Sequence, residues 1–126
     1  KSAQVAGQYN EAINAFKSVV QLNKAALAAE ARYEIASCWF QLNKLSVSEK
    51  AAFETISKSG SYDYWITKAY ILLGDIYFKQ KDYFNAKATF QSVVENTTDP
   101  ELKSEAQEKL NRVNAEDSQS SKVGEN

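Results

Sequence analysis

Apolar residues recur at helical spacing along most of this 126-residue chain. In residues 7–20, one apolar stripe is formed by Tyr9, Ala12, Ile13, Phe16, Val19 and Val20. An Ala-rich helical pattern follows in residues 25–42, and a further helix in residues 46–58. Residues 101–115 carry Leu102, Ala106, Leu110 and Val113 on one face and polar residues on the other. The pattern therefore predicts an all-α chain.

The most informative stretch runs from Ala69 to Val94. It contains Tyr70-x-x-Leu73-Gly74-x-x-Tyr77, then Ala86-x-x-x-Phe90, with Lys81-Asp82 as a plausible turn between two helices. Gly74 is small enough for a second helix to cross close by, and Tyr77 and Phe90 are large enough to fill the gap. This spacing resembles the tetratricopeptide repeat (TPR) signature, with Tyr where Trp is commoner. The resemblance implies a right-handed superhelix of antiparallel helix hairpins, a TPR solenoid of about two and a half repeats plus a C-terminal capping helix.

The other repeats match this unit less closely. Residues 7–20 align with residues 81–94, which places Phe16 opposite Phe90. In the middle repeat, Ile35-Ala36-x-x-Trp39-Phe40 aligns with Leu73-Gly74-x-x-Tyr77-Phe78 at an offset of 38, and Arg32 sits where the motif wants an aromatic residue. Phe53 aligns with Phe90 at an offset of 37, which predicts a longer turn at Asn43–Ser46 and puts Glu49 in place of the small Ala. We expect Phe16, Trp39, Phe53, Tyr77 and Phe90 to be buried between helices.

These alignments divide the chain into a TPR array, residues 1–115, and a polar C-terminal tail, residues 116–126. The array comprises helix B of repeat one (8–21), repeat two (25–58), repeat three (62–96) and the capping helix (99–115), with Lys1–Ala6 as the remainder of the first helix A. The protein is therefore expected to continue upstream. The apolar strip through Tyr9, Ala12, Ile13 and Phe16 is then a candidate for self-association.

Composition argues against catalysis. The chain has no His and one Cys, which leaves no His base, His-ligated metal, Cys–His pair or internal disulfide. No nucleophile–base pair, phosphate loop or metal-ligand cluster is apparent, so we expect no enzyme activity and no cofactor. The net charge of −1 without a basic stripe argues against RNA or other nucleic acid. No apolar run approaches the ~18 residues of a membrane helix. Cys38 is expected to be buried and inert.

In the family, helix A of each hairpin lines the concave surface. The resemblance thus implies a groove formed by Glu30, Tyr33, Ser37, Phe40 and Gln41 of repeat two and by Lys68, Ile71, Asp75, Phe78 and Lys79 of repeat three. Phe40 and Phe78 form either an aromatic floor for a ligand or part of the packing. Asp75 disfavours the carboxylate clamp of some relatives. Tyr62, Tyr64 and Trp65 form either an interaction patch or, as we favour, packing on the preceding helix B.

The resulting functional hypothesis is a protein–protein interaction scaffold or adaptor, within a larger bacterial TPR protein, whose concave groove binds a peptide or helix of a partner. The alternative is a self-associating structural spacer. The 37-residue spacing of Phe16, Phe53 and Phe90 exceeds the common 34 and resembles bacterial envelope TPR proteins of the outer-membrane assembly lipoprotein type or the Tol–Pal-associated type. That resemblance alone implies the periplasm or an association with the outer membrane.

Overall fold

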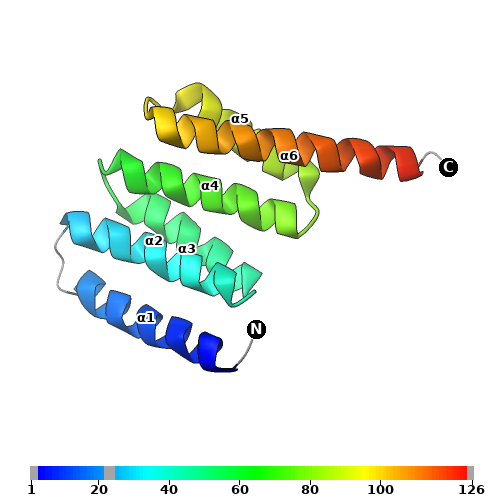
Figure 1. The fold of residues 1–126 in the computed structure, drawn as a ribbon. Coiled ribbons are helices and arrows are strands. Elements are labelled where there is room, and N and C mark those ends of the chain that lie inside the picture. Colours follow the sequence, from blue (N-terminus) through cyan, green and yellow to red (C-terminus); the bar gives the residue numbers. More distant parts are fainter. Residues whose placement is uncertain (1–2, 22–24, 125–126) are drawn as a thin grey trace. The chain divides into compact units, whose positions relative to one another are not determined.

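The computed structural model describes residues 3–21 and 25–124, and its regular structure within these ranges is entirely α-helical (Figure 1). The helices are α1 (Ala3–Gln21), α2 (Ala25–Gln41), α3 (Leu45–Lys58), α4 (Asp63–Lys79), α5 (Tyr83–Asn96) and α6 (Pro100–Gly124). The prediction of an all-α fold built from helix hairpins is confirmed.

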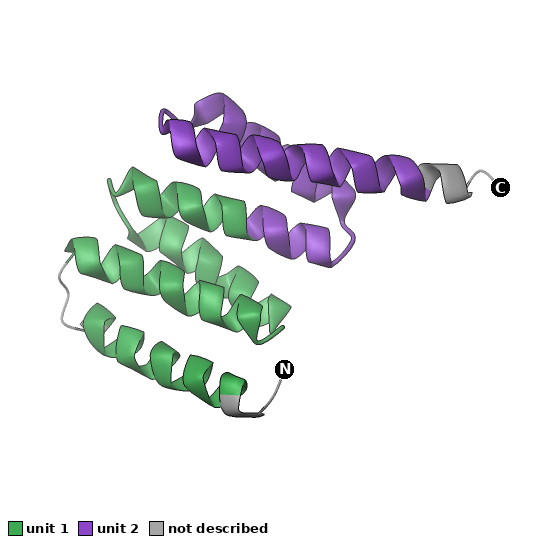
Figure 2. Cartoon of the chain, in the orientation of Figure 1, with its two compact units in different colours: residues 1–72 green, residues 73–126 purple. Residues whose placement is uncertain are grey.

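The chain forms two compact units, residues 1–72 and 73–126, with the boundary inside α4 (Figure 2). In the first unit, α1 packs against α2 and α2 packs against α3. In the second unit, α5 packs against α6. The division of the sequence into repeats stays a prediction.

The turns that close the two hairpins have the same length and geometry. Within residues 3–21 and 25–124, Asn43 and Lys81 are the non-glycine residues with positive φ, at 61° and 63°, and they lie 38 positions apart. Three backbone hydrogen bonds recur at the same offset. In the first turn, the N–H groups of Leu42, Asn43 and Lys44 donate to the carbonyl oxygens of Cys38, Phe40 and Trp39, respectively. In the second turn, the N–H groups of Gln80, Lys81 and Asp82 donate to those of Ile76, Phe78 and Tyr77. The longer turn expected at Asn43–Ser46 is therefore wrong, since α3 begins at Leu45.

This register changes which residues of α3 face the hairpin interior. The buried side chains are Ser48, Ala52 and Thr55 in α3 and Ala86, Phe90 and Val93 in α5, again 38 positions apart. Ser48, rather than Glu49, is therefore the small residue of the middle repeat. Phe53 is 47% exposed, so the expectation that it is buried is wrong, whereas the expectation for Phe90, at 0%, is confirmed. Phe16, Trp39 and Tyr77 are only half-buried.

The two hairpins achieve close helix contact with different residues. In the second unit, Gly74 leaves space that the ring of Phe90 occupies. In the first unit, the equivalent positions carry Ala36 and Ala52, both at 0% exposure. There the buried hydroxyl of Ser48 donates a hydrogen bond of 2.7 Å to the carbonyl oxygen of Ala36. This bond brings α2 and α3 together without a large side chain between them.

The first helix differs from its prediction. Residues 3–6 belong to α1 itself rather than to a separate helix, because Gly7 continues the helix instead of ending it. Lys1 and Ser2 lie outside the described residues.

The last helix also differs in length. Its start is capped by Asp99, whose Oδ1 accepts from the N–H groups of Glu101 and Leu102 at 2.9 and 3.2 Å. The predicted apolar face of Leu102, Ala106, Leu110 and Val113 is confirmed as buried. The helix continues past Ala115 to Gly124, through part of the predicted tail, and Lys87 of α5 pairs with Asp117 along this extension. Glu125 and Asn126 lie outside the described residues.

Candidate functional site

The residues predicted to line the groove differ in accessibility. In the first unit, Glu30 and Gln41 are exposed, Tyr33, Ser37, Phe40 and Lys68 are half-buried, and Ile71 is 2% exposed. In the second unit, Asp75 and Phe78 are half-buried and Lys79 is exposed. Ile71 therefore contributes to the core of the folded chain, while the others present some surface to a partner.

The structure brings Tyr33 and Lys68 together in a group that we call the aromatic cluster, formed by Tyr33, Tyr64, Trp65 and Lys68. The ring of Tyr33 lies 5.7 Å from that of Trp65, and Tyr64 meets Trp65 edge to face at 4.8 Å. Lys68 Nζ sits 5.4 Å from the Tyr33 ring centroid, within cation–π range. Trp65 thus contacts α2, a helix A, and its packing on the preceding helix B stays a prediction.

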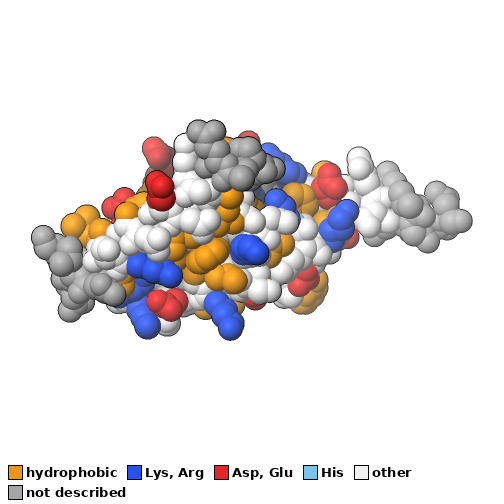
Figure 3. Space-filling view, turned by 90° about the horizontal axis from the view of Figure 1, so that it is seen from below, with side chains coloured by type: hydrophobic (Ala, Val, Ile, Leu, Met, Phe, Trp, Pro, Cys, Tyr) orange, Lys and Arg blue, Asp and Glu red, His pale blue; other side chains and the backbone are white. Residues whose placement is uncertain are grey.

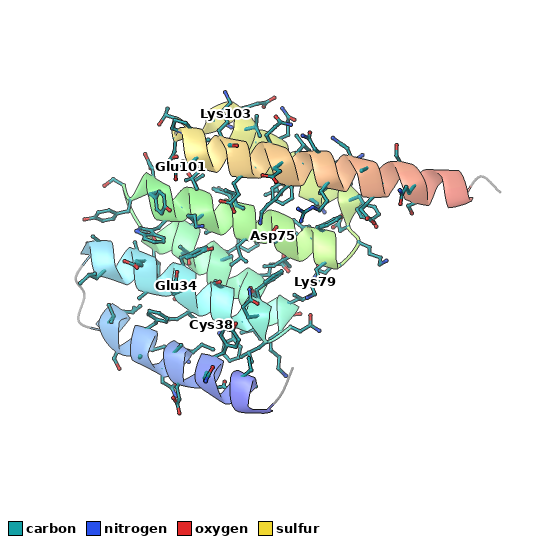
Figure 4. All side chains as sticks on the ribbon, in the orientation of Figure 1. Glu34, Cys38, Asp75, Lys79, Glu101 and Lys103 are labelled. Carbon is teal, nitrogen blue, oxygen red and sulfur yellow. The ribbon has the colours of Figure 1, made fainter. Side chains whose placement is uncertain are left out.

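Glu34 and Cys38 of α2 are labelled in Figure 4, and both have a shifted pKa. Burial raises the pKa of Glu34, the nearby charge of Glu30 raises it further, and Lys68 opposes the shift. Burial also raises the pKa of the Cys38 thiol, with a further contribution from Glu34. Cys38 is 7% exposed, so the prediction that it is buried is confirmed. The raised pKa disfavours the thiolate, which agrees with the prediction of an inert thiol.

In the second unit, Asp75 already has a partner. Its carboxylate oxygens lie 2.9 and 2.7 Å from Lys109 Nζ of α6. Burial raises the pKa of Asp75, and the charge and hydrogen bond of Lys109 oppose that shift. The repulsion that Asp75 would exert on a carboxylate is therefore weaker than its charge alone suggests. Phe78 contacts Tyr83 of α5, with ring centroids 6.0 Å apart.

A feature that the sequence analysis missed lies on the other side of α2. A cleft of about 400 Å³ is lined by Lys17 and Val20 of α1, by Arg32, Ile35 and Trp39 of α2, and by Val47, Lys50, Ala51 and Glu54 of α3. At 100° per residue, Ile35 and Trp39 project from the helix side opposite to Tyr33 and Ser37. The one sequence signal was Arg32, which occupies a position where the repeat motif favours an aromatic residue.

Basic groups dominate the charge of this cleft. Lys17, Arg32 and Lys50 face a single acid, Glu54, which lies 3.9 Å from Lys58. Arg32 Nη1 donates to the carbonyl oxygen of Lys58 at 3.0 Å, while its buried Nε has no hydrogen-bond partner. On the face drawn in Figure 3, hydrophobic side chains gather near the centre with Lys and Arg beside them.

Comparison with known proteins gives a family but no individual relative. One family model, described as tetratricopeptide repeat, matches residues 1–64, and a second model of the same description matches residues 68–96. No curated protein and no solved structure matches the chain significantly. In the described part of the chain, no helix is both long and apolar enough to cross a membrane.

Proposed function

We propose that this chain, which belongs to the tetratricopeptide repeat family, is a scaffold or adaptor whose helix A surface holds a peptide or helix of another protein. Repeats of this family generally serve protein–protein interaction and are typically non-catalytic. The absence of His from the sequence supports a non-enzymatic role.

The observation that carries it is the aromatic cluster. Tyr64 is 47% exposed, and Tyr33, Trp65 and Lys68 are half-buried, so rings and a cation are both held in place and accessible. Aromatic side chains of this kind dominate the binding energy of many interfaces, because they bury large areas at a low entropic cost. Lys68 adds a charge that selects the orientation of an incoming segment.

The remaining groove residues extend this surface. Ser37, Phe40 and Gln41 continue along α2, and Glu30 lies on its preceding turn. Their proposed role is to set the edges of the groove with hydrogen bonds and apolar contact. Asp75, Phe78 and Lys79 of the second unit keep the same proposed role, and Ile71 supports the surface from within.

Affinity capture with the immobilised chain tests the proposal. Proteins retained by the unmodified chain are expected to be lost with Tyr33→Ala and Lys68→Ala combined, since truncating an aromatic anchor weakens binding about tenfold or more. Lys103→Ala, at an exposed lysine of α6 outside both the groove and the cleft, is the matched control. Equal retention by the chain and the Tyr33/Lys68 variant, measured again with the purified partner by calorimetry, would reject the groove.

The second candidate function is a self-associating spacer, and one observation favours it: Phe84 is 82% exposed. The strip first proposed for self-association is less available, because Ile13 is 2% exposed and Tyr9, Ala12 and Phe16 are half-buried within the chain. Light scattering over a concentration series separates the functions. A mass that rises with concentration, and falls back in Phe84→Ser, supports the spacer.

The setting of the protein is also a proposal. We infer a larger bacterial TPR protein of the cell envelope, supported only by repeats that are longer than usual. The 38-residue offset between the two hairpin turns keeps that feature. Fractionation of cells that express the protein with a tag tests it, and recovery only with cytosolic markers would reject it.

A further inference from the structure

The cleft between α1, α2 and α3 shares no residue with the proposed groove, and it is large enough to hold side chains of a partner. Ile35 and Trp39 form its floor, and Val20, Val47 and Ala51 extend the apolar lining. Its volume of about 400 Å³ falls within the range of sites that bind ligands or a few partner side chains. All of the helices that form it belong to the first unit.

Charge identifies the kind of occupant. Lys17 of α1 and Lys50 of α3 are exposed at the lining, and Arg32 comes from α2, so each helix contributes a cation. Among the described residues that line the cleft, Glu54 is the only acid, and its side chain is 54% exposed beside Lys58. The cleft therefore has an excess of positive charge around an apolar floor.

Arg32 adds a specific donor. Its Nη1 is held by the carbonyl oxygen of Lys58, which orients the guanidinium, while Nε is buried and unpaired. A carboxylate suits the guanidinium of Arg32, because charge-assisted hydrogen bonds between guanidinium and carboxylate groups are strong.

We propose that this cleft docks a segment of a partner protein in which Asp or Glu residues flank apolar side chains. The apolar side chains occupy the floor at Ile35 and Trp39, and the carboxylates pair with Lys17, Lys50 and Arg32. Because the cations come from three different helices, an occupant must span the cleft to meet them, which a protein segment with several acids does.

Peptides displayed on phage, selected against the whole chain, provide the probe. The enriched sequences are expected to combine Asp or Glu with Leu, Ile or Phe. The chain has two Trp residues, Trp39 in the cleft and Trp65 in the aromatic cluster. A selected synthetic peptide is expected to shift the emission of Trp39 in a Trp65→Phe chain and to leave Trp65 unchanged in a Trp39→Phe chain.

Charge reversal completes the test. Lys17→Glu and Lys50→Glu combined are expected to weaken the peptide about tenfold, the sum of two partly exposed ion pairs. Both lysines are exposed, so the variant is expected to keep its circular dichroism spectrum, and the milder Lys→Gln pair is expected to show a smaller loss. Lys103→Glu, at an exposed lysine of α6 that belongs to neither the cleft nor the groove, serves as the control.

Several results would overturn the proposal. They are failure to enrich acidic peptides, a response of Trp65 instead of Trp39, or equal binding by the charge-reversed chain. A concentration-dependent mass that disappears in the reversed chain would assign the cleft to a second copy instead. Failure here leaves the groove proposal intact, because that proposal depends on Tyr33 and Lys68.

Discussion

Replacing Gly74 with Ala tests how closely α4 and α5 approach each other. A Cβ atom at this position would lie 2.3 Å from Cε1, 2.5 Å from Cζ and 2.8 Å from Cδ1 of Phe90. Ordinary contacts of a Cβ atom begin at 3.4 Å, so the ring would have to move by about an ångström. Phe90 is 0% exposed, which leaves its ring no adjacent solvent to enter.

Two opposing effects determine the free energy of unfolding. Ala is favoured over Gly in a helix interior by about 1 kcal/mol. Overpacking a close-packed interior costs about 1–3 kcal/mol, and the contacts at Phe90 place this substitution at the upper end. Packing therefore outweighs propensity, and Gly74→Ala is expected to lower the free energy of unfolding by about 1–2 kcal/mol.

Urea denaturation followed by circular dichroism measures the change. Gly7→Ala is the matched control, because Gly7 also lies inside a helix but an added Cβ there meets nothing within 4 Å. This control is expected to gain up to about 1 kcal/mol from propensity alone. Phe90→Leu is expected to lower the free energy of unfolding by less in the Gly74→Ala chain than in the unmodified chain, because the smaller side chain relieves the clash with the added Cβ. A stability gain in Gly74→Ala equal to that of Gly7→Ala would refute the reasoning.

Three further substitutions test other features. Phe90→Ala is expected to lower the free energy of unfolding by about 3–5 kcal/mol and Phe53→Ala by much less, measured with urea, because Phe53 is 47% exposed. Lys44, the N-cap of α3, makes no side-chain capping bond, so Lys44→Asp is expected to add about 1 kcal/mol in the same assay. Lys109→Met is expected to destabilise most near neutral pH. The pKa of Asp75 is raised in the folded chain, so protonation of Asp75 at lower pH favours folding. A protonated Asp75 carries no charge for Lys109 to neutralise. The loss of stability in Lys109→Met, measured with urea, is therefore expected to shrink as the pH falls.

Much of the fold follows from local sequence patterns. The hairpin of α4 and α5 was predictable because Gly74 and Phe90 are complementary in size and fall at a fixed spacing. The buried face of α6 was predictable from its period, since Leu102 and Leu110 lie on one side of a helix with few other apolar residues. In both cases the size or the apolar character of each residue indicates whether it is buried.

The register of α3 was not predictable in this way. Aligning Phe53 with Phe90 gave weight to the largest side chains, whereas the hairpin is organised by its smallest ones. Ser48 and Ala52 allow α3 to approach α2, and the hydroxyl of Ser48 donates a hydrogen bond to the carbonyl oxygen of Ala36. A buried serine has no apolar signature, so its position at the interface emerges only from the three-dimensional packing.

The candidate sites divide along the same line. The proximity of Tyr33 and Lys68 was predictable, because family geometry assigns both residues to one surface. In the structure, Lys68 Nζ lies 5.4 Å from the centroid of the Tyr33 ring. Neither the contact of Trp65 with Tyr33 nor the cleft was predicted. The cleft combines α1, α2 and α3, and no local period reports a space formed by three helices.

The departures of the middle repeat from the family pattern share one physical consequence. Arg32 stands 38 positions before Tyr70, where the better-matched repeat carries an aromatic ring. Tyr70 is 40% exposed, whereas Arg32 donates from Nη1 to the carbonyl oxygen of Lys58 and lines the cleft with Ile35 and Trp39. Arg32 thus adds a third cation to a cleft in which Lys17 and Lys50 already outnumber Glu54. The position at which the middle repeat departs from the family pattern therefore contributes, in the folded chain, a cation to the lining of the cleft.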